Sequence, residues 1–276
     1  MLPQLANTYN PTKNYGHFQW AASPKLDGIR ALYIPGEGLI SRSKKTQFVG
    51  FSSIERMCES ICKTDNLSFI DGELYIPGEK FDIISGIVRK SKNYDLDAKF
   101  RVELKVFAVG SIDAPLMPAG LMYDLIRFAI PDTGKVNYLP QTYIKNTPTV
   151  VQSFAELVKN NGDSDEGIML RNSTSVYASG RSDNLLKVKN FVKSNFVIVG
   201  FTKGTGKYAK SLGNVLIRGM VDGKIINAKV GTGFNDSERS NIWTNQSNYL
   251  GKDIEVIYLG VTANESLRHP IFSKLV

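Results

Sequence analysis

The feature that most constrains the fold is a long series of short runs of β-branched and aromatic residues, separated by Gly, Pro, Asn and Asp. Such runs are typical of strands joined by turns. Before residue 190 we predict strands at Ile29–Ile34, Phe69–Ile76, Phe100–Val109, Gly167–Arg171 and Leu185–Val188. Apolar residues at helical spacing predict helices at Ser52–Lys63, Leu121–Ile130 and Val150–Asn160. This part of the chain is therefore expected to be α+β.

The pattern changes after Phe191, where only strand and turn signatures remain. We predict strands there at Phe196–Thr202, Gly213–Arg218, Lys224–Val230 and Asp253–Tyr258. A series of short strands in a basic context suits a small, partly open barrel such as the OB-fold. We place the boundary near Lys189–Ser194, which gives one domain of residues 1–190 and an all-β domain of residues 191–276.

Cysteine and histidine usage excludes several classes of protein. The chain has two Cys and two His, too few for a disulfide scaffold or a zinc ribbon. Cys58 and Cys62 are four residues apart on one predicted helix, so we expect them to pack in the core. The N-terminus has no signal-peptide pattern, and no apolar run approaches the roughly 18 residues of a membrane span. We expect a cytoplasmic protein (in the host cytoplasm if a phage encodes it) without membrane contacts.

The net charge of +8 favours a polyanionic partner, and its distribution is uneven. Residues 190–276 carry 11 basic and 6 acidic side chains, whereas residues 1–189 carry 23 and 20. The stretch Asn184–Val221 contains no acidic residue at all. Its cations form either a solvated surface or a surface that follows phosphates.

Six short elements carry the chemistry, and they are Pro24–Arg30, Ser41–Ser43, Phe69–Tyr75, Leu104–Phe107, Asp165–Arg171 and Leu185–Lys189. On a strand, Asp71 and Glu73 project to the same side, and so do Lys187 and Lys189. A carboxylate pair and an ammonium pair on rigid strands suit Mg²⁺ with a phosphate. Taken singly, each element is better explained as a half-buried strand with a solvated face.

As an ordered set, these elements resemble the covalent nucleotidyltransferases and, within them, the small ATP-dependent DNA ligases of bacteriophages and bacteria. Lys25–Arg30 matches the Lys-x-Asp-Gly-x-Arg motif, and the tail Ser266–Phe272 resembles the last family motif. Ser41-Arg42 matches the next motif, although Lys44 stands where a Gly is frequent. The resemblance implies a nucleotidyltransferase (ATP-grasp-like adenylation) domain of antiparallel sheets with flanking helices, followed by an OB-fold barrel.

The resemblance implies a DNA ligase that seals 5′-phosphate/3′-hydroxyl nicks through a lysyl-AMP intermediate and a DNA-adenylate. ATP and Mg²⁺, for which Mn²⁺ can substitute, would be the cofactors, and nicked duplex DNA the partner of a monomer acting in DNA repair, replication or recombination. An RNA ligase or a capping-type nucleotidyltransferase shares the nucleophile motif and stays open as the alternative. A non-catalytic nucleic-acid-binding protein is disfavoured by the intact Lys25, Glu73 and Glu166.

The resemblance also implies residue roles, with Lys25 as the nucleophile. Half neutrality near pH 7.4 costs a lysine about 4 kcal/mol, which nearby cations can supply. The ATP or AMP would be bound by Ser23, Pro24, Lys25, Arg30, Glu73, Phe107, Met169, Lys187 and Lys189. The metal would be bound by Asp71, Glu73 and Glu166. The nick phosphate and the DNA would be contacted by Arg30, Arg42, Arg181, Lys203, Lys207 and Lys210. Pyrophosphate would be oriented by Arg268 and Lys274.

Overall fold

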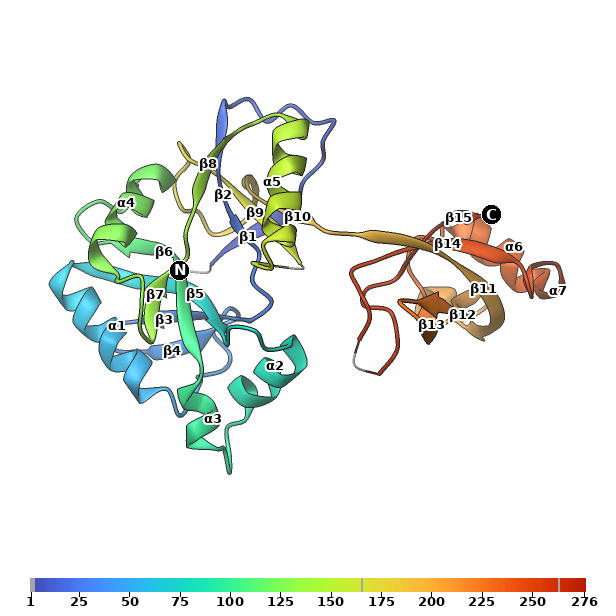
Figure 1. Ribbon diagram of the computed structural model, residues 1–276, viewed down its shortest axis with the longest axis horizontal. Coiled ribbons are helices and arrows are strands. Elements are labelled where there is room, and N and C mark those ends of the chain that lie inside the picture. Colours follow the sequence, from blue (N-terminus) through green and yellow to red (C-terminus); the bar gives the residue numbers. More distant parts are fainter. Residues whose placement is uncertain (1–2, 165, 263) are drawn as a thin grey trace. The chain divides into compact units, whose positions relative to one another are not determined.

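The computed structural model describes residues 3–164, 166–262 and 264–276, so Asp165 of the fifth element lies outside the described residues. The chain divides into two compact units, Met1–Val188 and Lys189–Val276 (Figure 1). This division falls two residues before the domain boundary that the sequence suggested. Among the described residues, no helix is both long and apolar enough to cross a membrane.

The first unit contains two five-stranded sheets. Sheet I has the order β1-β10-β9-β2-β8 and is built from Gln4–Thr8, Gly180–Lys189, Gly167–Asn172, Gln19–Pro24 and Thr142–Lys145. Sheet II has the order β4-β3-β5-β6-β7 and is built from Gly38–Ser41, Ile29–Ile34, Leu67–Tyr75, Glu103–Ser111 and Val136–Tyr138. Two of the strand pairs, β1 with β10 and β6 with β7, are parallel.

One face of each sheet is covered by helices. In sheet I, Ala22, Leu170 and Leu186 are buried in a cluster with apolar residues of α5 (Pro148–Asn160). In sheet II, alternate residues of β3, β5 and β6 pack with α1 (Ser52–Thr64) and α4 (Ala119–Ala129). Because side chains alternate along a strand, the polar residues of both sheets occupy the opposite faces. Contacts between β1 and β3 show that these two polar faces meet.

The structure has the three predicted helices of this unit, with Cys58 and Cys62 buried on α1 as expected. Two further helices, α2 (Phe81–Arg89) and α3 (Leu96–Phe100), lie between β5 and β6 and were not predicted. They form a compact insertion. Its last residue, Phe100, was predicted to begin the following strand but is the last residue of α3. The Ile and Val residues of α2 favour strands by propensity, and only packing of Ile84 and Val88 into the core makes the segment helical.

The second unit is a curved sheet of order β13-β12-β11-β14-β15. Its strands in chain order from β11 are Val192–Lys203, Leu212–Val221, Lys224–Val230, Asp253–Tyr258 and Ile271–Leu275. One parallel bridge joins Thr232, just after β13, to Ile271 at the start of β15. There, Phe272 N–H donates to the Thr232 carbonyl at 2.8 Å. The two edges of the sheet thus meet at one point, as in the partly open barrel that was predicted.

The prediction that this unit contains only strands and turns was wrong. It also has a short 3-10 turn (Gly206–Tyr208) and two helices, α6 (Asp236–Thr244) and α7 (Gln246–Tyr249). Helix α6 is polar on most sides and begins with a capping box, in which Asn235 and Glu238 exchange two hydrogen bonds of 2.8 Å. A polar helix has no apolar periodicity, so the Asn-x-x-Glu pattern was the only local indication of it.

Candidate active site

Lys25 follows directly after β2 and is fastened to the loop before β9. Its N–H donates to the Gly167 carbonyl at 2.9 Å. The Ser164 hydroxyl donates to the Lys25 carbonyl and accepts from Glu166 N–H at 3.1 Å. Two motifs that are 141 residues apart in sequence are thereby locked together by their backbones.

The Lys25 side chain forms an ion pair with Glu166, whose side chain is only 8% exposed. The contact stabilises the ammonium form of Lys25, whereas nucleophilic attack on a phosphate needs the neutral amine. Glu166 therefore holds the Lys25 amine in place and favours its protonated form.

Gly28 brings the lysine loop against β5 at a point where only glycine fits. A Cβ on residue 28 would stand 2.5 Å from the Leu74 carbonyl oxygen and 2.7 Å from Cγ of Glu73. Backbone carbonyls cannot yield such space, so glycine at this position sets the distance between the loop and the strand. The loop of Lys25 thus lies beside Glu73.

Glu73 is half-buried, and burial raises its pKa to about 8, against the opposing effects of Lys25 and Arg30. The nearby carboxylates of Asp71 and Asp27 raise its pKa further. Glu73 therefore keeps its proton to a higher pH than an exposed glutamate does.

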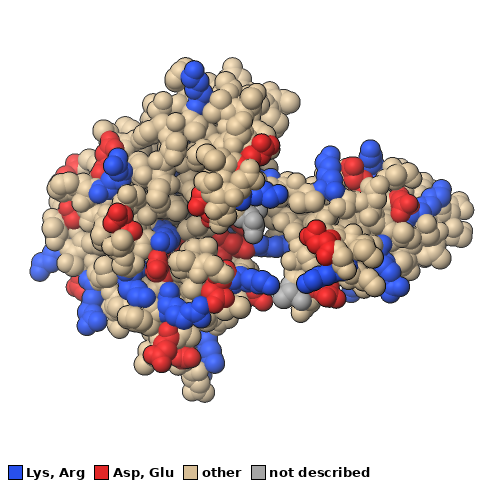
Figure 2. All heavy atoms as spheres, viewed as in Figure 1, with Lys and Arg blue, Asp and Glu red and all other residues tan. Residues whose placement is uncertain are grey.

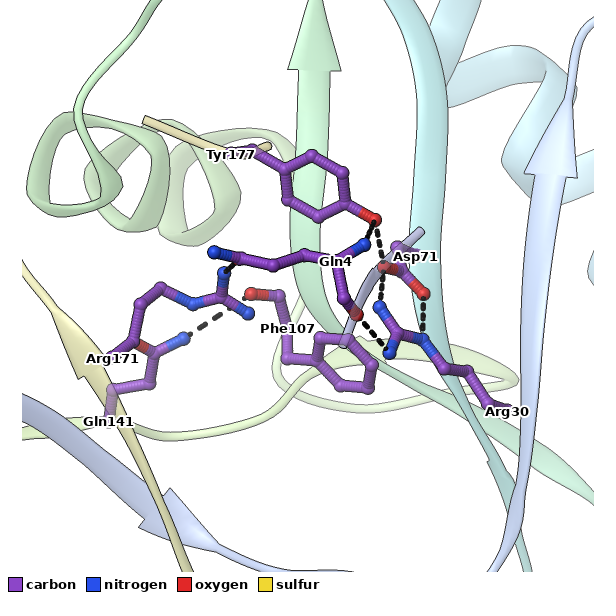
Figure 3. A network of polar contacts seen from close by, with 7 residues as sticks. All are labelled: Gln4, Arg30, Asp71, Phe107, Gln141, Arg171 and Tyr177. Atoms are coloured by element: carbon purple, nitrogen blue, oxygen red, sulfur yellow. Dashed lines mark hydrogen bonds and ion pairs between the residues drawn. The ribbon is translucent and has the colours of Figure 1, made fainter. Parts of the chain in front are cut away.

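Arg30 and Asp71 form the centre of a buried polar network (Figure 3). Arg30 Nε donates to Asp71 Oδ1 at 2.9 Å, and Nη2 donates to the other carboxylate oxygen. Tyr177 OH donates to Asp71 at 2.6 Å, and Arg30 Nη1 donates to the Gln4 carbonyl at 2.6 Å. The Arg30 guanidinium also lies 5.2 Å from the centroid of the Phe107 ring. Much of the donor capacity of Arg30 is thus committed within the protein.

The expected set of three metal-binding carboxylates is not gathered into one cluster. Among the described residues, no three His, Cys, Asp or Glu side chains converge on a common point. Asp71 is fully buried and bound by Arg30 and Tyr177, so its charge is already compensated. Glu73 and Glu166 are the two carboxylates that act on Lys25. The metal-binding role of Asp71 stays a prediction.

The residues expected to bind the adenine base belong to the two facing sheets. Ser23 is paired in register with Met169, and both alternate with the residues that pack on α5. Pro24 is paired with Ile168 at the end of the same ladder. Phe107, on β6 of sheet II, is half-buried. Gln141 joins the two sheets there through a 3.5 Å hydrogen bond from Nε2 to the Phe107 carbonyl (Figure 3).

Lys187 and Lys189 lie on β10, on the opposite side of the strand from the buried Leu186. Both are half-buried. Lys187 accepts a 3.0 Å hydrogen bond at its carbonyl from Tyr9 N–H, which ties β10 to β1. The predicted strand alternation of the two lysines is therefore present.

Apart from Arg30, which belongs to the buried network, the residues predicted to contact DNA are exposed. Arg42 lies in the turn after β4, and Arg181 donates to the Ala6 carbonyl. In the second unit, Lys203, Lys207 and Lys210 are exposed around the 3-10 turn, and Lys207 forms a 2.7 Å ion pair with Asp236. Figure 2 shows Lys and Arg side chains standing out from the surface of both units.

Arg268 and Lys274, predicted to orient pyrophosphate, both belong to the second unit. Arg268 is half-buried, and its backbone N–H donates to the Gly260 carbonyl at 2.9 Å. Lys274 is exposed on β15 opposite Glu255, whose pKa is lowered chiefly by a hydrogen bond from Ser273. Their role stays a prediction.

Sequence reasoning missed three members of the network, Gln4, Arg171 and Tyr177. Gln4 is fully buried, accepts from Arg171 through its side chain and donates its N–H to Tyr177 OH at 3.1 Å. Burial lowers the pKa of Arg171 to about 10. Arg171 is the last residue of the fifth element, so the sequence did show a cation in a buried strand. Nothing in the sequence indicated its partner Gln4, which is 167 residues away from Arg171.

Two family descriptions match the chain in the same order as its two units. The description "ATP dependent DNA ligase domain" matches residues 1–189, and "DNA ligase OB-like domain" matches residues 203–275. The chain belongs to the ATP-dependent DNA ligases. Nick sealing through AMP carried on a lysine is the general reaction of this family, and the predicted fold class and enzyme class are thereby confirmed.

Individual relatives agree with this assignment. A DNA ligase of Haemophilus influenzae is 28% identical over 94% of this chain and 86% of its own length. A solved structure from a study of Lig E DNA ligases covers 99% of this chain and 98% of its own, with 24% identity and a TM-score of 0.77. The Chlorella virus DNA ligase-adenylate covers 100% and 99%, with 23% identity and a TM-score of 0.52. Both structures share the fold of this chain.

Proposed function

We propose that Lys25 is the residue that carries AMP in this DNA ligase, and that the substrate is nicked duplex DNA. The observation that supports this most directly is the position of Lys25 between two carboxylates. Glu166 pairs with its amine, and Glu73 lies close enough for each group to influence the charge of the other. A partly buried lysine among charged groups is more typical of a functional site than of a solvated surface.

In the first step, a bond forms between Lys25 Nζ and the α-phosphorus of ATP, while the bond from that phosphorus to the bridging oxygen of pyrophosphate breaks. The amine must first lose a proton, which costs about 4 kcal/mol near neutral pH. Lys187 and Lys189, on the inner face of β10, would contact the α-phosphate and oppose a positive charge on Lys25. Arg268 and Lys274 would then orient the departing pyrophosphate.

Mg²⁺, with Mn²⁺ as a substitute, fits the donor chemistry of Glu73 and Glu166. Mg²⁺ prefers one or two carboxylates together with water and phosphate oxygens, and Glu73 and Glu166 are the carboxylates that act on Lys25. When bound, the ion neutralises charge that develops on phosphate oxygens. Asp71, the third carboxylate predicted for the metal, also holds Arg30.

The adenine base would stack between Phe107 and Met169, with Ser23 and Pro24 along its edge. Phe107 and Met169 belong to sheets whose polar faces meet, which supports a flat ligand between them. Gly28 keeps the lysine loop close to Glu73, so the ribose would lie beside that carboxyl group.

The nick would be held by exposed cations, with Arg42 and Arg181 on the first unit and Lys203, Lys207 and Lys210 on the second. A guanidinium fork suits the 5′-phosphate, and Arg42 is exposed in a turn. Arg30 would bind the 5′-phosphate of the nick through N–H groups that are not hydrogen-bonded to Asp71 or Gln4.

We infer that a single chain is the working unit and that it acts in the cytoplasm. Each unit has a hydrophobic core of its own. Both cysteines are unpaired and buried, which is typical of proteins from a reducing compartment.

The test is sealing of a 5′-phosphorylated nick with ATP and Mg²⁺, with matched substrates that carry DNA or RNA strands at the nick. Efficient sealing of the DNA nick, with GTP inactive as the nucleotide, is the expected result. Preference for the RNA nick would support the RNA-ligase alternative, and use of GTP would support a capping-type enzyme.

A further inference from the structure

A buried lysine outside the active site has no carboxylate partner among the residues that the structure describes. Lys99, on α3, is 2% exposed, and its ammonium donates to two backbone carbonyls, Val49 at 2.6 Å and Val88 at 3.4 Å. The rings of Phe51 and Tyr94 lie 4.4 and 4.9 Å from the same nitrogen. A buried cation costs free energy, and cation–π contacts recover part of it, so this arrangement requires an explanation.

The partners of Lys99 bracket a short basic segment. Val88 immediately precedes Arg89, Lys90 and Lys92, and Tyr94 closely follows them. We call Arg89–Lys92 the basic turn. Asn93, at its end, has a left-handed φ of 48°, which fixes the direction of the chain there. The basic turn is therefore held at both ends by one buried ammonium.

The three cations of the basic turn are exposed, and within the described part of the chain none of them forms an ion pair. The nearby acidic groups are engaged or lie elsewhere on the insertion. Glu79 pairs with Arg101, and Asp95 caps α3 by accepting from two backbone N–H groups. Asp82 stands in the first turn of α2, at the other end of that helix from the basic turn.

Lys99 also connects the basic turn to the segment that carries Arg42. That segment folds back on β4, because Ser41 N–H donates to the Thr46 carbonyl and Phe48 N–H donates to the Leu39 carbonyl, each at 2.8 Å. Val49, which Lys99 binds, is at its base. Gly50 follows with φ +83°, and a Cβ there would stand 2.7 Å from the Lys99 side chain. Two exposed basic segments are thus joined at one buried point.

The insertion follows closely on the strand that carries Glu73. Helix α2 begins six residues after β5 ends, and Leu74 near that end touches the lysine loop at Gly28. Nine helical residues span about 13 Å. With about 3.4 Å between phosphates of one strand, that length corresponds to about four nucleotides.

We propose that the basic turn binds backbone phosphates of the duplex that flanks the nick, and that Lys99 is the positioning residue that holds it there. The proposal rests on nicked duplex DNA being the substrate, as argued above. It adds a DNA contact on the first unit that none of the recognised motifs contains. Backbone contacts of this kind fix position without reading sequence.

The experiment measures the affinity of adenylated full-length chain for a nicked duplex in EDTA, over a range of salt concentrations. The variant Arg89→Gln/Lys90→Gln/Lys92→Gln should bind at least about tenfold more weakly, with a log–log salt slope up to about 2.7 shallower. Self-adenylation and the thermal midpoint should be unchanged, because the three side chains are exposed. The control Arg127→Gln/Lys145→Gln/Lys159→Gln removes the same charge from exposed positions on other elements and should leave the slope intact.

Duplex length provides a second readout. Shortening one arm of the duplex, with that arm closed by a hairpin loop so that it stays paired, should abolish the difference between the triple variant and the wild type once the arm no longer reaches the basic turn. Lys99→Met should flatten the salt slope with self-adenylation preserved, which loss of folding would not do. Should Lys99→Met fail to fold, the exposed triple variant decides alone.

Equal losses in both triple variants would overturn the proposal, because they would indicate a general charge effect. An unchanged slope in the basic-turn variant would overturn the proposal as well. It would favour an acidic protein as the partner of that surface. In either case, sealing of the nick by the wild type would show separately that the proposed function holds.

Discussion

The nucleotide site of the first unit and the basic loop of the second unit are built on opposite principles. In the first, Lys25, Arg30 and Asp71 each have partners inside the protein, and Asp71 is fully buried. In the second, Lys203, Lys207 and Lys210 are exposed, and only Lys207 has an ion-pair partner among the described residues. Substitutions in the nucleotide site should therefore change stability together with chemistry, whereas those in the basic loop should change only affinity and its salt dependence.

The largest effect on stability is expected from Asp71→Ala. This change leaves the guanidinium of Arg30 and the hydroxyl of Tyr177 without their shared acceptor. Breaking a buried ion pair on one side costs about 3–5 kcal/mol, measurable by urea unfolding. The matched variant Asp82→Ala removes an exposed carboxylate and should cost less than about 0.5 kcal/mol. Similar values for the two would contradict the role assigned to the buried network.

Glu73→Gln should alter the pH dependence of stability. Burial raises the pKa of Glu73 to about 8 from 4.5, so the folded chain retains a proton that the unfolded chain releases. Wild-type stability should then fall as pH rises from about 4.5 to 8. The glutamine variant cannot lose this proton. Measured without ATP or metal, its free energy of unfolding relative to that of the wild type should rise by about 2–4 kcal/mol between pH 5 and pH 9. A difference that stays constant across this range would rule out the raised pKa.

In the basic loop, two lysines should behave differently under salt. Lys210→Gln should make the log–log salt slope of DNA binding shallower by about 0.9, as expected for one lost phosphate contact. Lys207→Gln should change it less, because Asp236 already neutralises Lys207 at 2.7 Å. Asp236→Asn should make the slope steeper by freeing that cation. Equal slopes for all three variants would place the DNA contact of the second unit elsewhere.

The smallest effect concerns Lys44, which stands where the family often has glycine. Its φ is 58°, in the left-handed region that favours glycine. Lys44→Gly should raise the free energy of unfolding by about 0.5 kcal/mol, after allowance for the added freedom of the unfolded chain. The control is Lys45→Gly. Lys45 is exposed and its backbone is not left-handed, so glycine at this position should lower the free energy of unfolding. Equal losses in both variants would show that the conformation of Lys44 carries no strain.

The sequence predicted those features that depend on interactions between neighbouring residues. Strands Lys224–Val230 and Asp253–Tyr258 have the predicted bounds, because local alternation defines them. The placement of Lys187 opposite the buried Leu186 follows from the same alternation.

Long-range partners could not be predicted. The pairing of Arg30 with Asp71 joins residues 41 apart, and that of Gln4 with Arg171 joins residues 167 apart. Pattern and propensity describe only neighbouring residues, so the contact between Asp71 and Arg30 became visible only in three dimensions. Helix α6 was missed for a different reason, because its cap at Asn235 rather than an apolar stripe defines it.

The central claim is that Lys25 carries AMP, and the most direct test separates the first step from the last. Wild type, Lys25→Ala and the exposed-lysine control Lys145→Ala are incubated with α-labelled ATP and separated on a denaturing gel. The same three proteins are then given a nick that already carries AMP on its 5′-phosphate. We predict that Lys25→Ala takes up no label but still seals the adenylated nick, while the control does both. Covalent label on Lys25→Ala at the wild-type level would contradict the account.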